Sequence, residues 1–309
     1  MRVGVIGTGN MGENHIRTYS SMYHHCQLIG IYDIDETKRN EIAKKYNIKP
    51  FPSLDNLLKE VDAVSIAVPT KFHYDIGLKC IDNKVHMLLE KPMTSTVEQA
   101  EDLLYKSSKA GVILQVGHIE LFNPLIQELL KVLENKKIIG IEFQRMSPYH
   151  ERIKNIDVVE DLMIHDLYIL QEILKEDKLM DVQALGKIID GTIKHAVVIA
   201  TSRQEVIVQL TASFKSKSKV RTIQILTEDD FIEVNLLKKE INIRSSILTK
   251  TIKVDDSIHP LQVQLTDFIN CIKVKREPSV SGNEGIKALL ITNQISKEIS
   301  KIKNENKYL

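Results

Sequence analysis

This 309-residue chain has few cysteines, no tryptophan and no long apolar run, and these absences argue against particular classes of protein or site. It contains no tryptophan, and its three cysteines are far apart with no Cys-x-x-Cys pair, which argues against a thiolate metal site and suits a reducing compartment. No apolar run approaches the roughly 18 residues that a transmembrane helix needs. The 42 basic and 41 acidic residues nearly cancel, so charge gives no reason to expect nucleic acid or an anionic membrane as a partner.

What the chain does contain is typical of an ordinary globular protein, with 43% hydrophobic and 27% charged residues. Its first residues, MRVGVIGTGNMG, are interrupted by glycine almost at once and do not resemble a signal peptide, so we expect a cytoplasmic protein. The length exceeds the roughly 250 to 300 residues at which a single core stops growing. Two domains are therefore expected.

The first domain is expected over residues 1–120, where short apolar runs alternate with helix-like segments. The runs RVGVIG, CQLIGIYD, DAVSIAVP, VHMLLEKP and GVILQVGH are hydrophobic at successive positions, as in strands that helices cover on both faces. This pattern predicts a doubly wound parallel sheet of the Rossmann type. The helices are expected near 11–22, 36–46, 71–82 and 95–110.

The second domain is expected over residues 121–309. One helical stretch near 157–175 is followed by strand-like runs without helices between them, which predicts an α+β domain on a large, mainly antiparallel sheet. The strand candidates are 181–189, 195–201, 205–214, 219–227 and further runs up to 254. Two helical stretches close the chain, near 260–274 and 283–303, and the last of them is a candidate to return to the first domain.

A glycine pattern typical of dinucleotide binding follows the first apolar run. Gly7 permits a tight turn, Gly9 lets the backbone approach a pyrophosphate, and Gly12 allows a helix to pack closely. Asp33 ends the second run about 20 residues later, where a carboxylate binds a ribose diol and favours NAD, although the basic pair at 38–39 leaves NADP open. The expected cofactor contacts here are Gly7, Gly9, Asn10, Met11, Gly12 and Asp33.

Two charged residues end the fourth apolar run. Glu90, Lys91 and Pro92 follow at the carboxyl end of a predicted parallel strand, where ligands collect in such sheets. Proline fixes the backbone there, so the two charged side chains have a defined direction and are expected beside the cofactor. A lysine that is only a solvated surface residue is the alternative.

A second charged pair, Asp161 and His165, lies four residues apart on one face of a predicted helix. An imidazole with a reference pKa near ~6.5 can take a proton from a sugar hydroxyl at neutral pH. Hydride removal from a carbinol carbon requires such a base. The alternative is a local helix pair without a catalytic role.

Together these motifs resemble the Gfo/Idh/MocA oxidoreductase family, which has an N-terminal GxGxxG, a Glu-Lys-Pro after the fourth strand and a later Asp-x-x-x-His. The segment VPTKFH at 68–73 is similar to a Pro-x-x-x-His segment of that family. The resemblance implies cofactor contacts from Pro69, Thr70, His73, Glu90 and Lys91. It also implies an NAD-dependent enzyme that assembles as a homodimer or homotetramer through its second domain.

For the reaction, the same resemblance implies that Lys91 lies between cofactor and substrate, that Asp161 orients the substrate and that His165 is the acid/base. Which of Lys91 and His165 receives the proton stays open. A non-catalytic regulator that keeps the fold and binds dinucleotide is an alternative, which loss of the lysine or the histidine would favour. Both residues are present.

The substrate is indicated by two stretches, QVGHIELFNP at 115–124 and SPYHERIKNIDVVEDLMIHD at 147–166. Both are similar to the UDP-N-acetylglucosamine 3-dehydrogenases of the family, which implies oxidation of a 3-hydroxyl to a ketone. Leu121 replaces the arginine usual in that group, and a polyol, inositol or glucose-type dehydrogenase is the alternative. The expected substrate contacts are His118, Asn123 and Arg152.

Among these three, Arg152 is the preferred cation for a diphosphate because guanidinium forms bidentate bonds to phosphoryl oxygens, with Arg145 a less favoured alternative. His118 could instead satisfy a buried hydrogen bond. No metal is expected, because neither His118 with Glu120 nor the pair at 24–25 has the third ligand of a catalytic zinc site.

Overall fold

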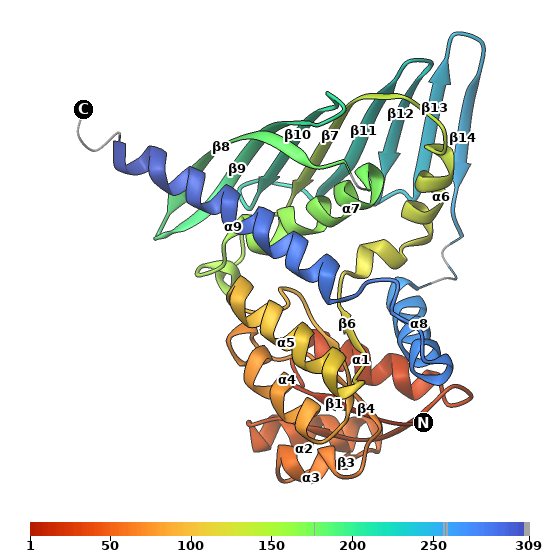
Figure 1. Ribbon diagram of the computed structural model, residues 1–309, viewed down its shortest axis with the longest axis vertical. Helices are drawn as coiled ribbons and strands as arrows, with labels where there is room; N and C mark the ends of the chain where they lie inside the picture. The colour runs from red at the N-terminus through yellow and green to blue at the C-terminus, as the bar shows by residue number, and fades with distance from the viewer. Residues whose placement is uncertain (176, 256, 258, 306–309) are drawn as a thin grey trace. The chain divides into compact units, whose positions relative to one another are not determined.

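The computed structural model describes residues 1–175, 177–255, 257 and 259–305, without the side chains of residues 152 and 302–305. The chain forms two compact units, each containing a late segment of the sequence (Figure 1). Unit 1 consists of Met1–Phe122 with Ile258–Leu289, and unit 2 of Asn123–Ser257 with Leu290–Leu309. No helix in the described part of the chain is both long enough and apolar enough to cross a bilayer.

Unit 1 is built on a six-stranded parallel sheet in the order β3-β2-β1-β4-β5-β6, which confirms the predicted doubly wound sheet. Strands β1, β4 and β5 are almost entirely buried, as expected when helices cover both faces. The strands are β1 Arg2–Ile6, β2 Gln27–Tyr32, β3 Lys49–Pro50, β4 Ala63–Ile66, β5 His86–Leu89 and β6 Leu114–Val116.

Three helices of unit 1, α2, α3 and α5, begin at a side chain that accepts a hydrogen bond from the first helical turn. Asp35, Ser53 and Thr96 each accept a hydrogen bond from a backbone N–H of the first turn that follows. The helices are α1 Asn10–Ser21, α2 Glu36–Tyr46, α3 Leu54–Leu58, α4 His73–Asp82, α5 Val97–Ala110 and α8 Pro260–Val274, with short 3-10 turns η1 Thr70–Phe72 and η2 Ile119–Phe122.

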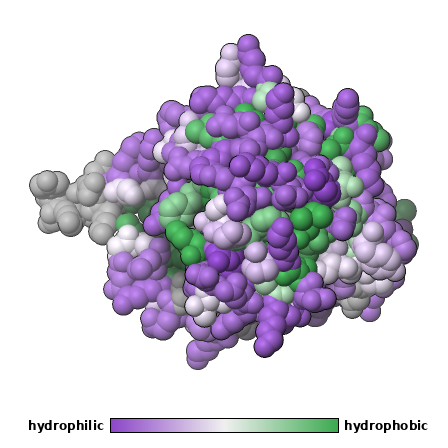
Figure 2. Space-filling view, turned by 90° about the horizontal axis from the view of Figure 1, so that it is seen from below, coloured by the Kyte–Doolittle hydropathy of each residue, from purple (hydrophilic) through white to green (hydrophobic). Residues whose placement is uncertain are grey.

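Helix α8 packs in the same core as the first strand although about 250 residues separate them in the chain. Leu265, Phe268 and Ile269 belong to one buried cluster with Val3 and Tyr19. Burial of such side chains contributes roughly 1.5–3 kcal/mol each. In the view of Figure 2, hydrophilic residues cover most of the face shown and hydrophobic residues lie between them in separate areas.

Unit 2 is built on an eight-stranded sheet in the order β14-β13-β12-β11-β7-β10-β9-β8. Every pairing is antiparallel except that of β7 with β10, so the predicted mainly antiparallel sheet is confirmed. The strands are β7 Ile138–Met146, β8 Leu179–Ile189, β9 Thr192–Ser202, β10 Ile207–Ser213, β11 Val220–Thr227, β12 Asp230–Asn235, β13 Glu240–Ser245 and β14 Thr249–Lys253.

The helices of unit 2 lie along one side of this sheet (Figure 1). A Cβ on Gly186 of β8 would lie 2.7 Å from a side-chain carbon of Ile299, so the last helix packs directly on that strand. The elements are α6 Pro124–Val132, the 3-10 turn η3 Glu151–Ile153, the π-helical turn η4 Val159–Met163, α7 Ile164–Leu174 and α9 Gly282–Glu305, whose first residues belong to unit 1.

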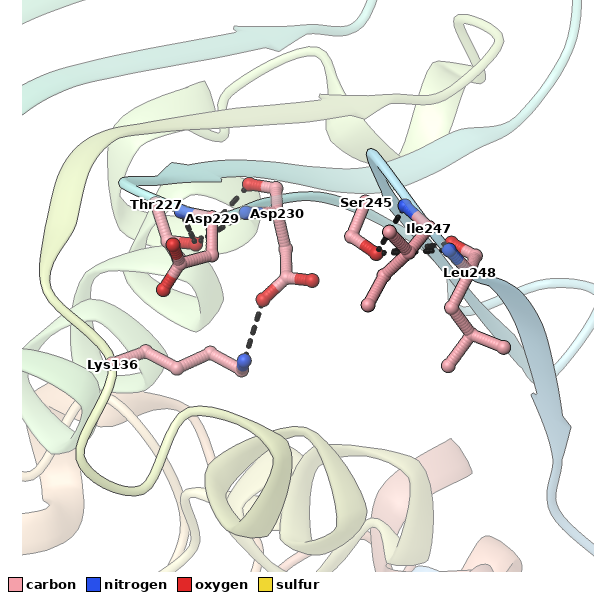
Figure 3. A network of polar contacts seen from close by, with 7 residues as sticks. All are labelled: Lys136, Thr227, Asp229, Asp230, Ser245, Ile247 and Leu248. Carbon is pink, nitrogen blue, oxygen red and sulfur yellow. Dashed lines mark hydrogen bonds and ion pairs between the residues drawn. The ribbon is translucent and has the colours of Figure 1, made fainter.

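Polar contacts fix the turns at one end of the sheet (Figure 3). The hydroxyl of Thr227 accepts from the N–H of Asp230 at 2.9 Å in the β11–β12 turn, and the hydroxyl of Ser245 accepts from the N–H of Leu248 at 3.1 Å in the β13–β14 turn. The carboxylate of Asp230 pairs with Lys136 in the segment before β7. The ion pair connects the segment before β7 to the first residue of β12.

Candidate functional site

The predicted site residues are divided between the two units, and those of unit 1 begin with the glycine loop between β1 and α1. Gly7 has φ +91, and a Cβ there would lie 2.5 Å from the carbonyl oxygen of Ala67. A Cβ on Gly12 would lie 1.9 Å from the carbonyl oxygen of Gly7. Only glycine allows this turn and this approach of α1 to the loop.

Gly9 differs from these two because it leaves open space. It is the N-cap residue of α1, and a Cβ added to it would meet nothing within 4 Å. Asn10 and Met11 form the first turn, where backbone N–H groups lack partners within the helix and the helix dipole is positive. Open space in front of such a helix end fits a diphosphate, so the residues present suit a dinucleotide.

Asp33 lies directly after β2 and holds the glycine loop. One of its carboxylate oxygens accepts from the N–H of Thr8 at 2.6 Å and from the hydroxyl of Thr8 at 2.8 Å, and the other accepts from the N–H of Asp35 at 2.9 Å. Burial acts to raise the pKa of this carboxyl, but the hydrogen bonds from Asp35 and Thr8 outweigh it and the pKa is lowered. The group is therefore an anion at neutral pH.

Of the two basic residues after Asp33, Arg39 is engaged within the protein. The guanidinium of Arg39 is buried and donates to the carbonyl oxygen of Asp33 at 3.0 Å. The backbone N–H of Lys38 donates to Asp35 at 3.0 Å. The positive charge of Lys38 acts on Asp33 and contributes to its lowered pKa.

Glu90 follows β5 and is buried, with 8% of its surface exposed. Its Oε1 lies 3.0 Å from Nε2 of His15, which is completely buried in α1. A Cβ on Gly117 would lie 2.9 Å from the same carboxyl group, so the strand end β6 packs against it. The carboxylate of Glu90 therefore connects the end of β5 to α1 and to the end of β6, at the carboxyl end of the sheet.

Lys91 is half-buried and is joined to Pro92 by a cis peptide bond. Its charge acts on His118, which is buried just after β6. Burial, and to a lesser degree the Lys91 ammonium, lowers the pKa of His118 from 6.5 to about 3. His118 is therefore a neutral imidazole at any physiological pH.

His73 connects the segment after β4 to the turn that contains Lys91. The side chain is buried, and its ring nitrogens lie 2.8 Å from the carbonyl oxygen of Val68 and 3.0 Å from that of Pro92. Burial lowers its pKa although both hydrogen bonds act to raise it. Pro69 and Thr70 lie between these contacts, exposed and half-buried respectively.

In unit 2, Asp161 lies in the π-helical turn and His165 at the start of α7. The structure thus differs from the predicted α-helix here, since a π turn of the kind that recurs at functional sites precedes the helix. Nδ1 of His165 is hydrogen-bonded to the hydroxyl of Tyr168, and the two rings meet edge-on with centroids 5.5 Å apart. Tyr168 was not predicted, although the spacing i, i+3 on one helix face was available as a signal.

The remaining predicted residues have structural partners or lie outside the description. Arg145 is buried with its Nε 2.8 Å from Oδ1 of Asp166, so this alternative cation is engaged in an ion pair. The side chain of Asn123 accepts from the N–H of Leu125 at 3.0 Å and caps α6. Arg152 belongs to η3, but its side chain lies outside the described residues.

Residues 1–118 match the model of an oxidoreductase family with an NAD-binding Rossmann fold, Gfo/Idh/MocA. The UDP-N-acetylglucosamine 3-dehydrogenase of Acidithiobacillus ferrooxidans is 33% identical over 244 residues, which cover 79% of this chain and 76% of that protein. The myo-inositol 2-dehydrogenase of Thermotoga maritima is 26% identical over 217 residues, or 64% of each chain.

Solved structures extend the likeness to both units. A crystal form of the same Acidithiobacillus ferrooxidans enzyme has a TM-score of 0.91 and 30% identity, with 97% of each chain covered. An oxidoreductase from Agrobacterium radiobacter in complex with NAD+ has a TM-score of 0.86 at 16% identity, which shows the shared fold.

Proposed function

We propose a substrate for this chain, which belongs to the Gfo/Idh/MocA oxidoreductase family and is a dehydrogenase that acts on a CH–OH group. The proposed reaction is oxidation of the 3-hydroxyl of UDP-N-acetylglucosamine or a close UDP-hexosamine. The observation that supports this substrate is the 33% identity over 79% of the chain to an enzyme of that name. In sequence, two inositol dehydrogenases align with a smaller part of the chain, 57% and 64% of its length.

We propose NAD rather than NADP as the cofactor. The ionised Asp33 would accept hydrogen bonds from a ribose diol and repel a 2′-phosphate. Arg39, one of the two cations that could neutralise such a phosphate, donates to the backbone carbonyl of Asp33 instead. When bound, NAD supplies the acceptor for the hydride that leaves the carbinol carbon.

In this proposal His165 takes the proton of the sugar hydroxyl. The hydrogen bond between Nδ1 and the hydroxyl of Tyr168 fixes the orientation of the ring, and we assign proton transfer to Nε2. Asp161, in the turn just before, orients the sugar through its hydroxyls. Removing that proton as the hydride leaves avoids a positively charged carbonyl product.

Lys91 is proposed to contact the sugar hydroxyl that is oxidised, where its ammonium stabilises the negative charge that develops on the oxygen. Contacts on both sides of Lys91 support a fixed placement: Glu90 is held by His15, and Pro92 is held by His73. The neutral imidazole of His118 adds no second positive charge to compete with the ammonium. Arg152 remains the residue proposed, from the sequence alone, to bind the diphosphate of the UDP-sugar.

A polyol or inositol dehydrogenase is the second candidate, favoured by Leu121, which replaces the arginine usual in UDP-N-acetylglucosamine 3-dehydrogenases. The two are separated by following NADH absorbance with UDP-N-acetylglucosamine, UDP-N-acetylgalactosamine, myo-inositol and glucose. We expect turnover of a UDP-hexosamine that Lys91→Ala and His165→Ala each abolish while NAD binding is kept. Turnover of inositol or glucose alone would overturn the proposal, and full activity of either variant would overturn the roles assigned here.

We also propose that two or more copies assemble through the face of the eight-stranded sheet opposite its helices. The strand registers place Leu185, Ile199, Ile207 and Leu226 on one face, and their exposed fractions are 63%, 52%, 57% and 47%. An apolar face of this kind is stabilised when a second copy covers it. Light scattering should give a mass of at least twice 35.2 kDa, and a monomer at micromolar concentration would contradict the assembly.

A further inference from the structure

Strand β9 of unit 2 contains a buried lysine, Lys194, which belongs to none of the sequence motifs described above. Lys194 is 1% exposed, and its Nζ lies 2.7 Å from the carbonyl oxygen of Ile153, 2.8 Å from that of Lys154 and 2.9 Å from that of Ile156. The three carbonyls belong to the segment between β7 and the π-helical turn. The ammonium of Lys194 thus donates hydrogen bonds to three backbone carbonyls of this segment.

The match between the lysine and its partners is complete. An ammonium has three N–H donors, and the three carbonyls accept one each, whereas a neutral amine could donate only two. Burial lowers the pKa of Lys194, and the carboxylates of Asp157 and Asp190 act to raise it. These carboxylates favour the charged form that the three carbonyls require.

Backbone groups of the segment also form hydrogen bonds to one another and to Thr192. The N–H groups of Ile153, Lys154 and Ile156 donate within the segment, and the carbonyl of Ile153 accepts from Ile156 as well as from Lys194. The hydroxyl of Thr192, also in β9, donates to the carbonyl of Lys154 at 3.2 Å. Without the ammonium, the carbonyls of Ile153 and Lys154 would each keep one of these donors, and the carbonyl of Ile156 would lose the bond from Lys194 that fixes its direction.

The segment leads directly to Asp161. The carboxylate of Asp157 accepts from the N–H of Val159 at 2.8 Å at the start of the π turn, and its carbonyl accepts from the N–H of Asp161 at 3.1 Å. Asp157 therefore connects the segment that Lys194 holds to the residue assigned to the sugar. A shift of the three carbonyls would move Asp157 and, with it, Asp161.

We propose that Lys194 is a positioning residue for substrate binding: its ammonium acts as a built-in cation that sets the shape of residues 151–157 and thereby places Asp161. This inference rests on the proposed function, in which Asp161 contacts the sugar. It predicts a defect in sugar binding that leaves NAD binding unchanged, because the glycine loop belongs to unit 1.

The test is Lys194→Ala with chemical rescue. Alanine keeps Cβ, so the missing group corresponds to propylammonium. We expect KM for the UDP-sugar to rise on the order of 100-fold because a misplaced contact weakens substrate binding, with KM for NAD unchanged. Propylammonium should restore the lost activity, and 1-propanol should not. Lys250→Ala, which removes an exposed lysine of the edge strand β14, is the matched control and should behave as the wild type.

A variant with unchanged KM for the UDP-sugar, or one that propanol rescues as well as propylammonium does, would overturn the proposal. Should Lys194→Ala fail to fold, Lys194→Met keeps the apolar volume and is tested by hydrogen exchange. The amides of Ile153, Lys154 and Ile156 should exchange at least about tenfold faster than in the wild type. Unchanged exchange would contradict the role of Lys194 whatever the substrate is, and inactivity of the wild type towards UDP-sugars would contradict only the proposed function.

Discussion

Nε2 of His15 and Oε1 of Glu90 lie 3.0 Å apart inside unit 1, although 75 residues separate them in the chain. His15 is in the helix that begins at the glycine loop, and Glu90 directly precedes Lys91. The hydrogen bond therefore connects the cofactor loop to the turn that presents the lysine. A charge that is unfavourable at the end of a buried strand is stabilised by a partner from another element.

Replacing His15 by alanine should destabilise unit 1 because the buried carboxylate of Glu90 loses this partner. A hydrogen bond to a charged group contributes about 1.5–3 kcal/mol, and the free energy of unfolding should fall by that amount. Denaturant unfolding measures it, with His24→Ala, at an exposed position of the same region, as the control. Equal losses in both variants would show that the hydrogen bond contributes nothing.

Gly12→Ala and Gly9→Ala should separate folding from cofactor binding. A Cβ at Gly12 would lie 1.9 Å from the carbonyl oxygen of Gly7, and such overpacking costs roughly 1–3 kcal/mol or more. A Cβ at Gly9 meets no protein atom within 4 Å, so that variant should keep its melting temperature and lose NAD affinity. Calorimetry of unfolding and of NAD binding tests both, and tight NAD binding by Gly9→Ala would refute the assigned position of the diphosphate.

Much of unit 1 was predictable because its signals are local in the chain. Each strand of the parallel sheet is a continuous apolar run, and the conformations of Gly7 and Gly12 follow from the spacing of the glycines. The partner of Glu90 was not predictable, because no periodicity relates residues 15 and 90. Such a pairing follows from the way α1 packs on the sheet.

The pH dependence of stability should reveal the buried imidazole of His118. Its pKa is lowered from 6.5 to about 3, so between these values the unfolded chain binds a proton that the folded chain does not. Stability therefore falls as the pH is lowered through this window, by at most about 1.4 kcal/mol per pH unit for this group.

Unfolding free energies measured from pH 4 to pH 6.5 should show a smaller slope for His118→Asn than for the wild type. Some slope will persist, since burial also lowers the pKa of His73 and of His86. Identical slopes in wild type and variant would mean that His118 is not buried as a neutral group.

Tyr168→Phe tests the orientation of His165. The variant keeps the buried ring and removes only the hydroxyl that bonds Nδ1. We expect kcat to fall roughly tenfold and the acid limb of the pH profile to shift, with KM for NAD unchanged, because the base loses its fixed orientation. Tyr105→Phe, at an exposed tyrosine, is the control. A wild-type pH profile in Tyr168→Phe would remove this residue from the account.

Unit 2 was less predictable, and the reasons are physical. Helix α6 and strand β7 were not predicted, although Asn123 and Pro124 form a cap and first turn and residues 138–146 alternate in burial. The parallel pairing of β7 with β10 joins strands about 70 residues apart, and only the folded sheet reveals it. Lys194 occupies a position in an ordinary strand pattern, and its partners come from a segment about 40 residues earlier.

The transfer of hydrogen from C3 of the sugar tests the central claim most directly. UDP-N-acetylglucosamine carrying deuterium at C3 is incubated with NAD and the protein, and the reduced cofactor is analysed by mass spectrometry. The account predicts reduced cofactor that carries the deuterium, together with a sugar that has lost it. Reduced cofactor without deuterium, or no reduction of the cofactor in the presence of this sugar, would contradict the assignment.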